Sequence, residues 1–120
     1  MSHNLTIGKK GEEIAVEFLV EKGYLILERN WRFKKAEIDI IAKDKDGTLV
    51  FVEVKTRSYT YFGEPEAFVN DKKKSLMLDT ASEYMRTIDY DWAIRFDIIG
   101  IVIEKEGSPK VSHFEDAFFD

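Results

Sequence analysis

The sequence contains no cysteine in its 120 residues, which excludes disulfide bonds, thiolate metal sites and cysteine nucleophiles. It also lacks an apolar run long enough to span a membrane, and its N-terminus lacks the apolar core of a signal peptide. We therefore expect a cytoplasmic protein with no membrane partner. Internal repeats and low-complexity tracts are missing as well. The length fits one domain, residues 1–120, and is too short for two.

Positive charge is in deficit. The formal net charge of −5 argues mildly against a nucleic-acid partner, because phosphate contacts need cations. The distribution matters more than the sum, since acidic residues concentrate in 12–21 and 104–120. Basic residues concentrate in 29–35, 55–57 and 72–74. A basic strip beside a carboxylate site is therefore compatible with this sequence.

Residues 37–55 alternate between apolar and polar positions on both sides of a Lys-Asp-Gly turn, which predicts a β-hairpin. Apolar strands of this kind usually lie in a sheet that is covered on both faces. Asp39, Glu53 and Lys55 would then point into largely buried surroundings. A buried charge is costly unless it is paired or bound to a metal, so these three residues are the first candidates for a functional site.

The turn of this hairpin decides whether the charges meet. In one register Asp44 pairs with Thr48 across a three-residue loop, and Gly47 takes the left-handed conformation. Asp39 then faces Glu53 at about 5 Å between Cβ atoms. A two-residue Asp-Gly turn, which the dipeptide alone favours, shifts the register by one and moves Asp39 to the opposite face. We predict the three-residue loop, because it gathers the charges on one face.

The remaining pattern predicts an α/β fold in which a mixed sheet is flanked by two helices. The first helix is expected over residues 7–22, and the second from Asn70 or Asp71 to about Thr87. The strands expected outside the hairpin are 24–27, 92–103 and 110–114. Trp31 and Phe33 lie among basic residues, and we expect them to pack on the sheet; a base-stacking surface is the alternative.

Some charged residues in the two predicted helices have more than one interpretation. Glu12 falls inside the apolar arc of the first helix, where it is either a carboxylate favoured by the helix dipole or a third acid directed at the hairpin. Lys72, Lys73 and Lys74 fall in the first turn of the second helix, where the dipole disfavours positive charge. They indicate either an anionic partner such as phosphate or lysines that only keep the surface soluble.

The run Glu37-Ile-Asp39, followed by Phe51-Val-Glu53-Val-Lys55-Thr-Arg57, resembles the PD-(D/E)XK nuclease superfamily. More closely, the chain resembles the YraN family of bacterial proteins, which are similar to archaeal Holliday-junction resolvases. The other matching positions are Gly8, Gly11, Glu12, Ala15, Gly23, Tyr24, Asn30–Arg32, Ile38–Ala42 and Arg95–Asp97. Two positions depart from the pattern: Ile38 replaces the superfamily's proline, and Ala36 replaces the family's glycine. The resemblance implies a restriction-endonuclease-like core.

The same resemblance implies a DNA endonuclease that uses Mg²⁺ or Mn²⁺ and acts on branched or nicked DNA. Asp39 and Glu53 would be direct metal ligands, and the Val54 carbonyl a further one. Glu12 would act directly or through water. Lys55 would orient the attacking water or stabilise the pentavalent phosphorane. Magnesium prefers few carboxylates and several waters, so this ligand set suits it.

Basic residues complete the expected site. The residues expected to contact nucleic acid are Arg32, Lys34, Arg57, Lys72 and Lys73. Symmetrical cutting of two strands would require a homodimer, for which the apolar tail 117–119 or a sheet edge is the expected interface. Two other interpretations stay open: a non-catalytic nucleic-acid-binding module on the nuclease fold, and a protein-interaction subunit. For the hairpin charges alone, a buried ion pair without catalysis is the corresponding alternative.

Overall fold

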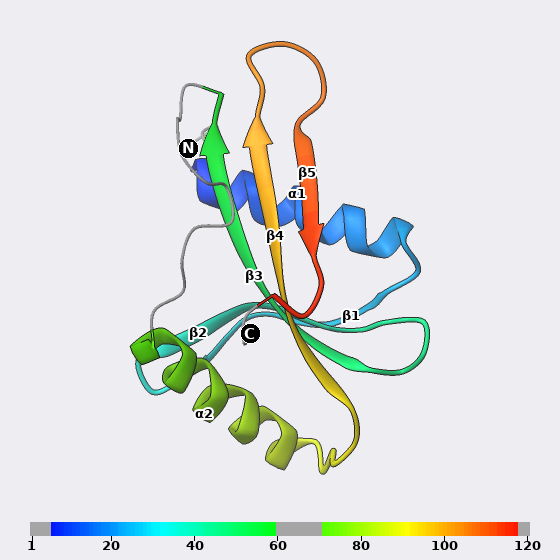
Figure 1. The fold of residues 1–120 in the computed structure, drawn as a ribbon, viewed down its shortest axis with the longest axis vertical. Coiled ribbons are helices and arrows are strands. Elements are labelled where there is room, and N and C mark those ends of the chain that lie inside the picture. The colour runs from blue at the N-terminus through cyan, green and yellow to red at the C-terminus, as the bar shows by residue number, and fades with distance from the viewer. Residues whose placement is uncertain (1–5, 60–70, 118–120) are drawn as a thin grey trace, which may run out of the picture.

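The computed structural model describes residues 6–59 and 71–117. Its elements in chain order are α1 (Ile7–Glu21), β1 (Leu25–Phe33), β2 (Ala36–Lys43), β3 (Leu49–Ser58), α2 (Asp71–Thr87), β4 (Ile94–Ile103) and β5 (Lys110–Phe114). Within these ranges the strands form one sheet in the order β1-β2-β3-β4-β5 (Figure 1). Only β3 and β4 pair in parallel, because α2 crosses over between them. The predicted α/β class and mixed sheet are confirmed.

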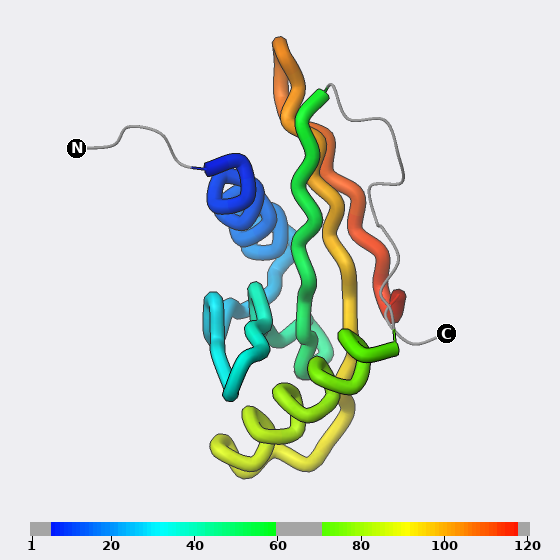
Figure 2. The backbone as a smooth tube through the Cα atoms, turned by 90° about the vertical axis from the view of Figure 1, so that its left-hand side faces the viewer, coloured from blue at the N-terminus to red at the C-terminus, as the bar shows by residue number. Residues whose placement is uncertain are grey.

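The two helices cover opposite faces of the sheet. α1 lies behind β3, β4 and β5, and α2 lies against the lower part of the sheet (Figures 1 and 2). Leu19 of α1 packs in one core with Val52, whereas Met77 and Tyr84 of α2 pack in the other with Phe51. Residues 49–52 of β3 therefore enter the two cores alternately, which explains why the strand begins with an uninterrupted apolar run.

The predicted hairpin register is confirmed. The Asp44 N–H donates to the Thr48 carbonyl at 3.0 Å, and Gly47 has a φ of 86°. This is the three-residue loop with a left-handed glycine. In the strands that follow, Ile40 pairs with Val52, and one further step along the same register places residue 39 opposite residue 53.

Predicted and observed boundaries differ most at β1. The sequence predicts a strand over 24–27, but the strand runs from Leu25 to Phe33. Ile26 pairs with Ala42 while Glu28 pairs with Ile41, so a β-bulge interrupts the alternation on which the prediction rested. The strand predicted from Trp92 instead begins at Ile94, and Trp92 is 71 % exposed. β3 ends at Ser58, three residues beyond the predicted end of the hairpin, and the remaining helices and strands agree with their predicted bounds within a residue.

A second charged cluster holds β4 and β5 to the β1–β2–β3 region. Arg95 donates to both carboxylate oxygens of Asp97, at 2.9 and 3.0 Å, and to the Tyr24 hydroxyl at 2.8 Å. The His113 Nε2 lies 2.8 Å from Asp97. Burial would raise the pKa of Asp97, but hydrogen bonds from His113, Arg95 and the Asp116 N–H outweigh it and lower that pKa. We assign this cluster a structural role, since every charge in it has a partner.

Two regions named in the sequence analysis lie wholly or partly outside the described residues. They are the predicted cap Asn70, which falls in the undescribed residues 60–70, and residues 118–119 of the predicted dimer tail. Ala117 is described: it packs on the α2-side core, and its N–H donates to the Phe96 carbonyl at 3.0 Å. In the described ranges, neither helix is long and apolar enough to cross a membrane.

Candidate active site

The candidate site lies where β2 and β3 separate. Their ladder ends at the pair Ile40–Val52. The next N–H on this edge of β3 is that of Val54, and it donates to Asp39 Oδ2 at 2.8 Å rather than to a β2 carbonyl. The carboxylate of Asp39 therefore replaces a strand carbonyl and is fixed at the edge of β3.

The backbone of Val54 adds a second oxygen at this position. In a strand, the N–H and C=O of one residue point to the same edge. Because the Val54 N–H reaches Asp39, the Val54 carbonyl oxygen faces the same gap between β2 and β3. The resemblance implies this carbonyl as a ligand, and its direction is compatible with that role.

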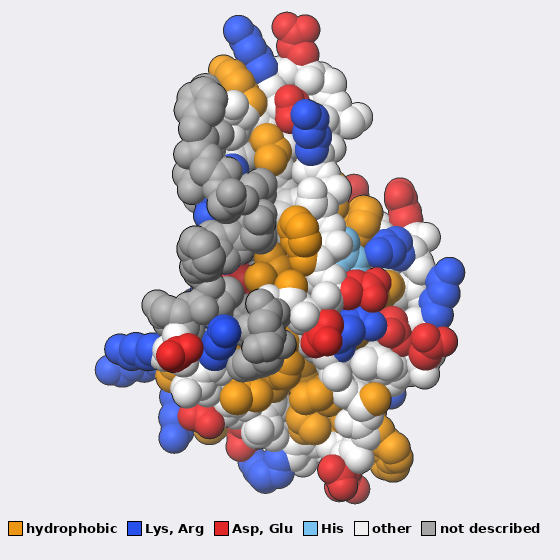
Figure 3. Space-filling view, viewed as in Figure 1, with side chains coloured by type: hydrophobic (Ala, Val, Ile, Leu, Met, Phe, Trp, Pro, Cys, Tyr) orange, Lys and Arg blue, Asp and Glu red, His pale blue; other side chains and the backbone are white. Residues whose placement is uncertain are grey.

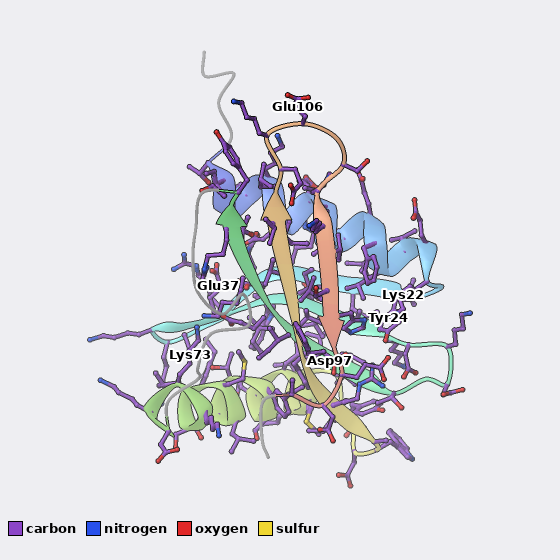
Figure 4. All side chains as sticks on the ribbon, turned by 45° about the horizontal axis from the view of Figure 1, so that its top comes forward. Lys22, Tyr24, Glu37, Lys73, Asp97 and Glu106 are labelled. Carbon is purple, nitrogen blue, oxygen red and sulfur yellow. The ribbon has the colours of Figure 1, made fainter. Side chains whose placement is uncertain are left out.

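Glu53 is the buried acid of the site, and two lysines contact it. Lys73 Nζ of α2 lies 2.6 Å from Glu53 Oε2, and Lys55 Nζ lies 3.5 Å from the same oxygen. The Glu53 side chain is 9 % exposed. Figure 4 shows Lys73 at the left, above the start of α2, whereas Lys22 and Tyr24 lie at the right of the view and Asp97 lies near its centre. A buried carboxylate is thus neutralised from its own strand and from a helix.

Among the residues of this site, Asp39 has the pKa that departs most from its ordinary value. Burial raises the pKa of Asp39 to about 7, and the negative charges of Glu53, Glu12 and Glu37 act in the same direction. The hydrogen bond from Val54 lowers the pKa but does not offset burial. Burial therefore disfavours a second ionised carboxylate beside Glu53, and a divalent cation would stabilise it.

The donor set fits magnesium or manganese. Asp39, Glu53 and the Val54 carbonyl offer only hard oxygen atoms, and Mg²⁺ uses one or two carboxylates with several waters. Within the described part of the chain, no group of three His, Asp or Glu side chains is close enough together to hold a metal. Glu53 is turned to Lys73, and Glu12 accepts a hydrogen bond from Asn30 Nδ2 at 3.0 Å. A metal at Glu53 would therefore compete with Lys73 for this carboxylate.

A groove leads away from the acidic pair along α2. Asp39 and Glu53 line a pocket of about 430 Å³ between β2, β3 and the start of α2. A second pocket of about 430 Å³ continues between the β1–β2 turn and α2, and the two share Lys35, Ala36 and Leu76. We call the two pockets together the α2 groove. Basic side chains gather at its end of the molecule, at the lower left of Figure 3.

Residues 11–101 match the family described as "Uncharacterised protein family UPF0102". The chain belongs to the UPF0102 family. This is the YraN family, so the resemblance found in the sequence is confirmed. A UPF0102 protein of Flavobacterium psychrophilum is 51% identical over 99% of this chain and 98% of its own. One from Rhodococcus opacus is 40% identical over 98% of this chain and 100% of its own.

Two solved structures were also found to be similar to this UPF0102 chain. A repair endonuclease from Pyrococcus abyssi has a TM-score of 0.44 and 16% identity, over 89% of this chain and 42% of its own. Pyrococcus furiosus SfsA in complex with Ca²⁺ has a TM-score of 0.44 and 16% identity, over 94% of this chain and 64% of its own.

Three of the predicted phosphate contacts of the UPF0102 chain line the α2 groove. Lys72 and Lys73 line the pocket of the acidic pair, and Lys34 lines the second pocket. Lys35 also lines both pockets and was missing from the predicted contacts. The sequence shows only that it belongs to a basic stretch. Which side of a two-residue turn faces a helix depends on tertiary packing.

The two predicted arginine contacts lie outside the groove lining. Arg32 is largely exposed, and its Nε lies 3.2 Å from Glu37. Arg57 is further along β3 and donates to the Thr56 carbonyl at 3.0 Å. The predicted packing of Trp31 is confirmed by its edge-to-face contact with Tyr84, whose ring centroid is 5.1 Å away. In this UPF0102 protein, the groove lysines are thus better placed than the arginines to meet a ligand at the acidic pair.

Proposed function

We propose that this UPF0102 protein is a metal-dependent endonuclease that hydrolyses phosphodiester bonds of DNA in the cytoplasm. One observation carries the proposal. Two carboxylates from separating strands, Asp39 and Glu53, line one pocket, and the Lys55 ammonium lies 3.5 Å from Glu53. Buried charges of this kind seldom improve stability over apolar residues. Their convergence in an open pocket therefore favours a chemical role.

The proposed roles follow from the position of each group. Asp39, Glu53 and the Val54 carbonyl would hold Mg²⁺ or Mn²⁺, with Glu12 acting on the site through water or charge. When bound, such an ion polarises the phosphodiester and lowers the pKa of an attacking water. Lys55 remains beside Glu53, where its ammonium orients that water and offsets negative charge on the phosphorane.

DNA would enter along the α2 groove. Lys34, Lys35 and Lys72 line it and would bind phosphates on the way to the acidic pair. We propose branched or nicked DNA as the substrate. A branched substrate cut on two strands needs two sites related by a two-fold axis, so a homodimer belongs to the same proposal.

The test combines cleavage with a change at one ligand. Supercoiled plasmid, nicked plasmid and a synthetic four-way junction are incubated with the protein in Mg²⁺, in Mn²⁺ and in EDTA. We expect cleavage only with metal, and a loss of about 100-fold in rate for Glu53→Gln, which keeps the side-chain shape and removes the charge. Glu106→Gln, an exposed position in the β4–β5 turn (Figure 4), is the matched control.

Two results would contradict the proposal. Cleavage that persists in EDTA and in Glu53→Gln would come from a contaminant. Junction binding without cleavage in either metal would favour the non-catalytic nucleic-acid-binding module instead.

A further inference from the structure

Lys73 occupies the position where positive charge is needed at the acidic pair. Its Nζ lies 2.6 Å from Glu53 Oε2, closer than Lys55 at 3.5 Å, and both lysines bind the same oxygen. An ammonium group at this distance repels a divalent cation that binds the same carboxylate and competes with it for Oε2. The Lys73–Glu53 contact is therefore expected to weaken or open when Glu53 becomes a metal ligand.

The two lysines differ in how easily they can leave Glu53. The Lys73 side chain is 41 % exposed, whereas that of Lys55 is 18 % exposed. Lys73 can swing its ammonium into water by rotating its flexible stem, without unpacking the sheet. Lys55 lies within β3 beside Glu53 and stays near the site. Exchange is therefore expected at Lys73.

The position of Lys73 in α2 gives it a second partner. It lies in the first turn of the helix, where the dipole disfavours cations and favours anions. Glu53 offsets that disadvantage in the metal-free protein. Once a divalent cation binds Glu53, the released ammonium lies beside Lys72 at the mouth of the α2 groove. A phosphate there would be stabilised by both lysines and by the helix N-terminus.

We propose that Lys73 is an exchangeable counter-ion of the site. It neutralises Glu53 in the metal-free protein, yields Glu53 to the divalent cation, and then contacts a phosphate of DNA in the α2 groove. This rests on the proposed function, because it needs a metal and a phosphate at the same site. One side chain then couples the two ligands, so each increases affinity for the other.

The test uses Lys73→Met, which keeps the length of the side chain and removes its charge. Mn²⁺ binding to the DNA-free protein is measured by calorimetry. We expect it to tighten about fivefold, because the competing ion pair is lost. Binding of a fluorescent four-way junction is measured by anisotropy in Ca²⁺, and we expect it to weaken about fivefold. A purely structural lysine would not shift the two affinities in opposite directions.

Lys72→Met is the matched control, since Lys72 lines the same pocket one residue away. It should weaken junction binding and leave Mn²⁺ affinity within about twofold of the wild type, because the direct contact to Glu53 comes from Lys73. Lys73→Arg keeps the charge and should restore both affinities toward wild-type values. If circular dichroism shows that Lys73→Met does not fold, Lys73→Gln replaces it in both measurements.

Unchanged or weaker Mn²⁺ binding in Lys73→Met would overturn the inference, and so would equal tightening in Lys72→Met. Tighter Mn²⁺ binding with unchanged junction binding would overturn the phosphate contact. Mn²⁺ binding to the wild type and to Glu53→Gln shows whether the counter-ion role alone fails or the proposed function fails with it. If the wild type binds Mn²⁺ and Glu53→Gln does not, the metal site stands whatever Lys73 does. If the wild type binds no Mn²⁺, the proposed function and the counter-ion role both fail.

Discussion

At the scale of single residues, Asp39 should make the metal-free protein less stable as the pH rises. Its folded-state pKa of about 7 lies above the unfolded value of about 3.9. The folded state therefore binds this proton more tightly, and the free energy of unfolding falls between about pH 4 and pH 7. Asp39→Asn should remove that fall and make the protein about 4 kcal/mol more stable at pH 8 in EDTA, while abolishing cleavage.

Urea unfolding at pH 5 and pH 8 measures this difference. The range from pH 5 to pH 8 separates the effect of Asp39 on stability from that of Asp97, whose pKa is lowered. The stabilisation from Asp97 is fully present above its unfolded pKa of about 3.9 and is lost only as the pH falls through the folded value. Asp91→Asn, at an exposed position before β4, is the control. If Asp39→Asn destabilised the protein equally at both pH values, the Asp39 carboxylate would instead stabilise the fold through its hydrogen bond from the Val54 N–H.

How much of the site could be predicted depends on sequence separation. Asp39, Glu53 and Lys55 belong to one hairpin, so a turn type and a period of two were enough to bring them together. The contact between Lys73 and Glu53 joins residues 20 positions apart. It depends on where α2 packs, which no local pattern specifies. The same holds for Glu12, which accepts a hydrogen bond from Asn30 because α1 packs against β1.

At the scale of elements, the contact of α1 with β3 depends on a glycine. A Cβ on Gly11 would lie 1.9 Å from Thr56 Oγ1 and 2.8 Å from Thr56 Cβ. Gly→Ala in a helix normally stabilises by about 1 kcal/mol, but here it would force α1 away from the sheet. We expect Gly11→Ala to lower the free energy of unfolding by about 2 kcal/mol in urea titrations.

A second substitution tests that explanation. Thr56→Ala removes the two side-chain atoms beyond Cβ, so the double variant should recover about half of the loss. Gly8→Ala is the matched control, because a Cβ there meets nothing closer than 4.0 Å. If the free energy of unfolding fell equally in the single and the double variant, the strain would lie elsewhere in α1.

The Arg95–Asp97 pair makes an independent prediction about β4. Arg95→Met would remove two hydrogen bonds from Asp97, which is fully buried. Breaking a buried pair costs about 3 kcal/mol, since an incompletely compensated charge is left behind. We expect a loss of that size in the free energy of unfolding. Arg95→Met with Asp97→Leu should be less destabilised than Arg95→Met alone, and the opposite order would contradict the charge explanation.

The bounds of a helix or strand were predicted well where one or both of its faces are buried. β5 and α2 have the bounds that their patterns indicate. β1 does not, because Glu28, Arg29 and Asn30 form a polar run and a bulge shifts the period. That strand is held by pairing with β2, which is a tertiary cause that its own sequence does not show.

At the scale of the whole molecule, the net charge of −5 conceals a local balance in the α2 groove. The described residues lining its two pockets include five cations, namely Lys34, Lys35, Lys72, Lys73 and Arg86. They also include five carboxylates, namely Glu37, Asp39, Glu53, Asp79 and Glu83. With every carboxylate ionised these charges cancel, so the metal-free groove has little attraction for phosphate. One divalent cation at Asp39 and Glu53 would give the groove a net charge of +2.

A divalent cation should therefore strengthen DNA binding by this acidic protein even when no cleavage occurs. We expect junction affinity to be about tenfold higher in Ca²⁺ than in EDTA at matched ionic strength, as measured by anisotropy. Lys35→Ala should weaken binding and make the slope of log affinity against log salt shallower by about one, because one phosphate contact is lost. Lys105→Ala, exposed in the β4–β5 turn, should change neither quantity. Equal affinity in Ca²⁺ and EDTA would mean that DNA binds on another surface, since only the groove gains charge from a metal at the acidic pair.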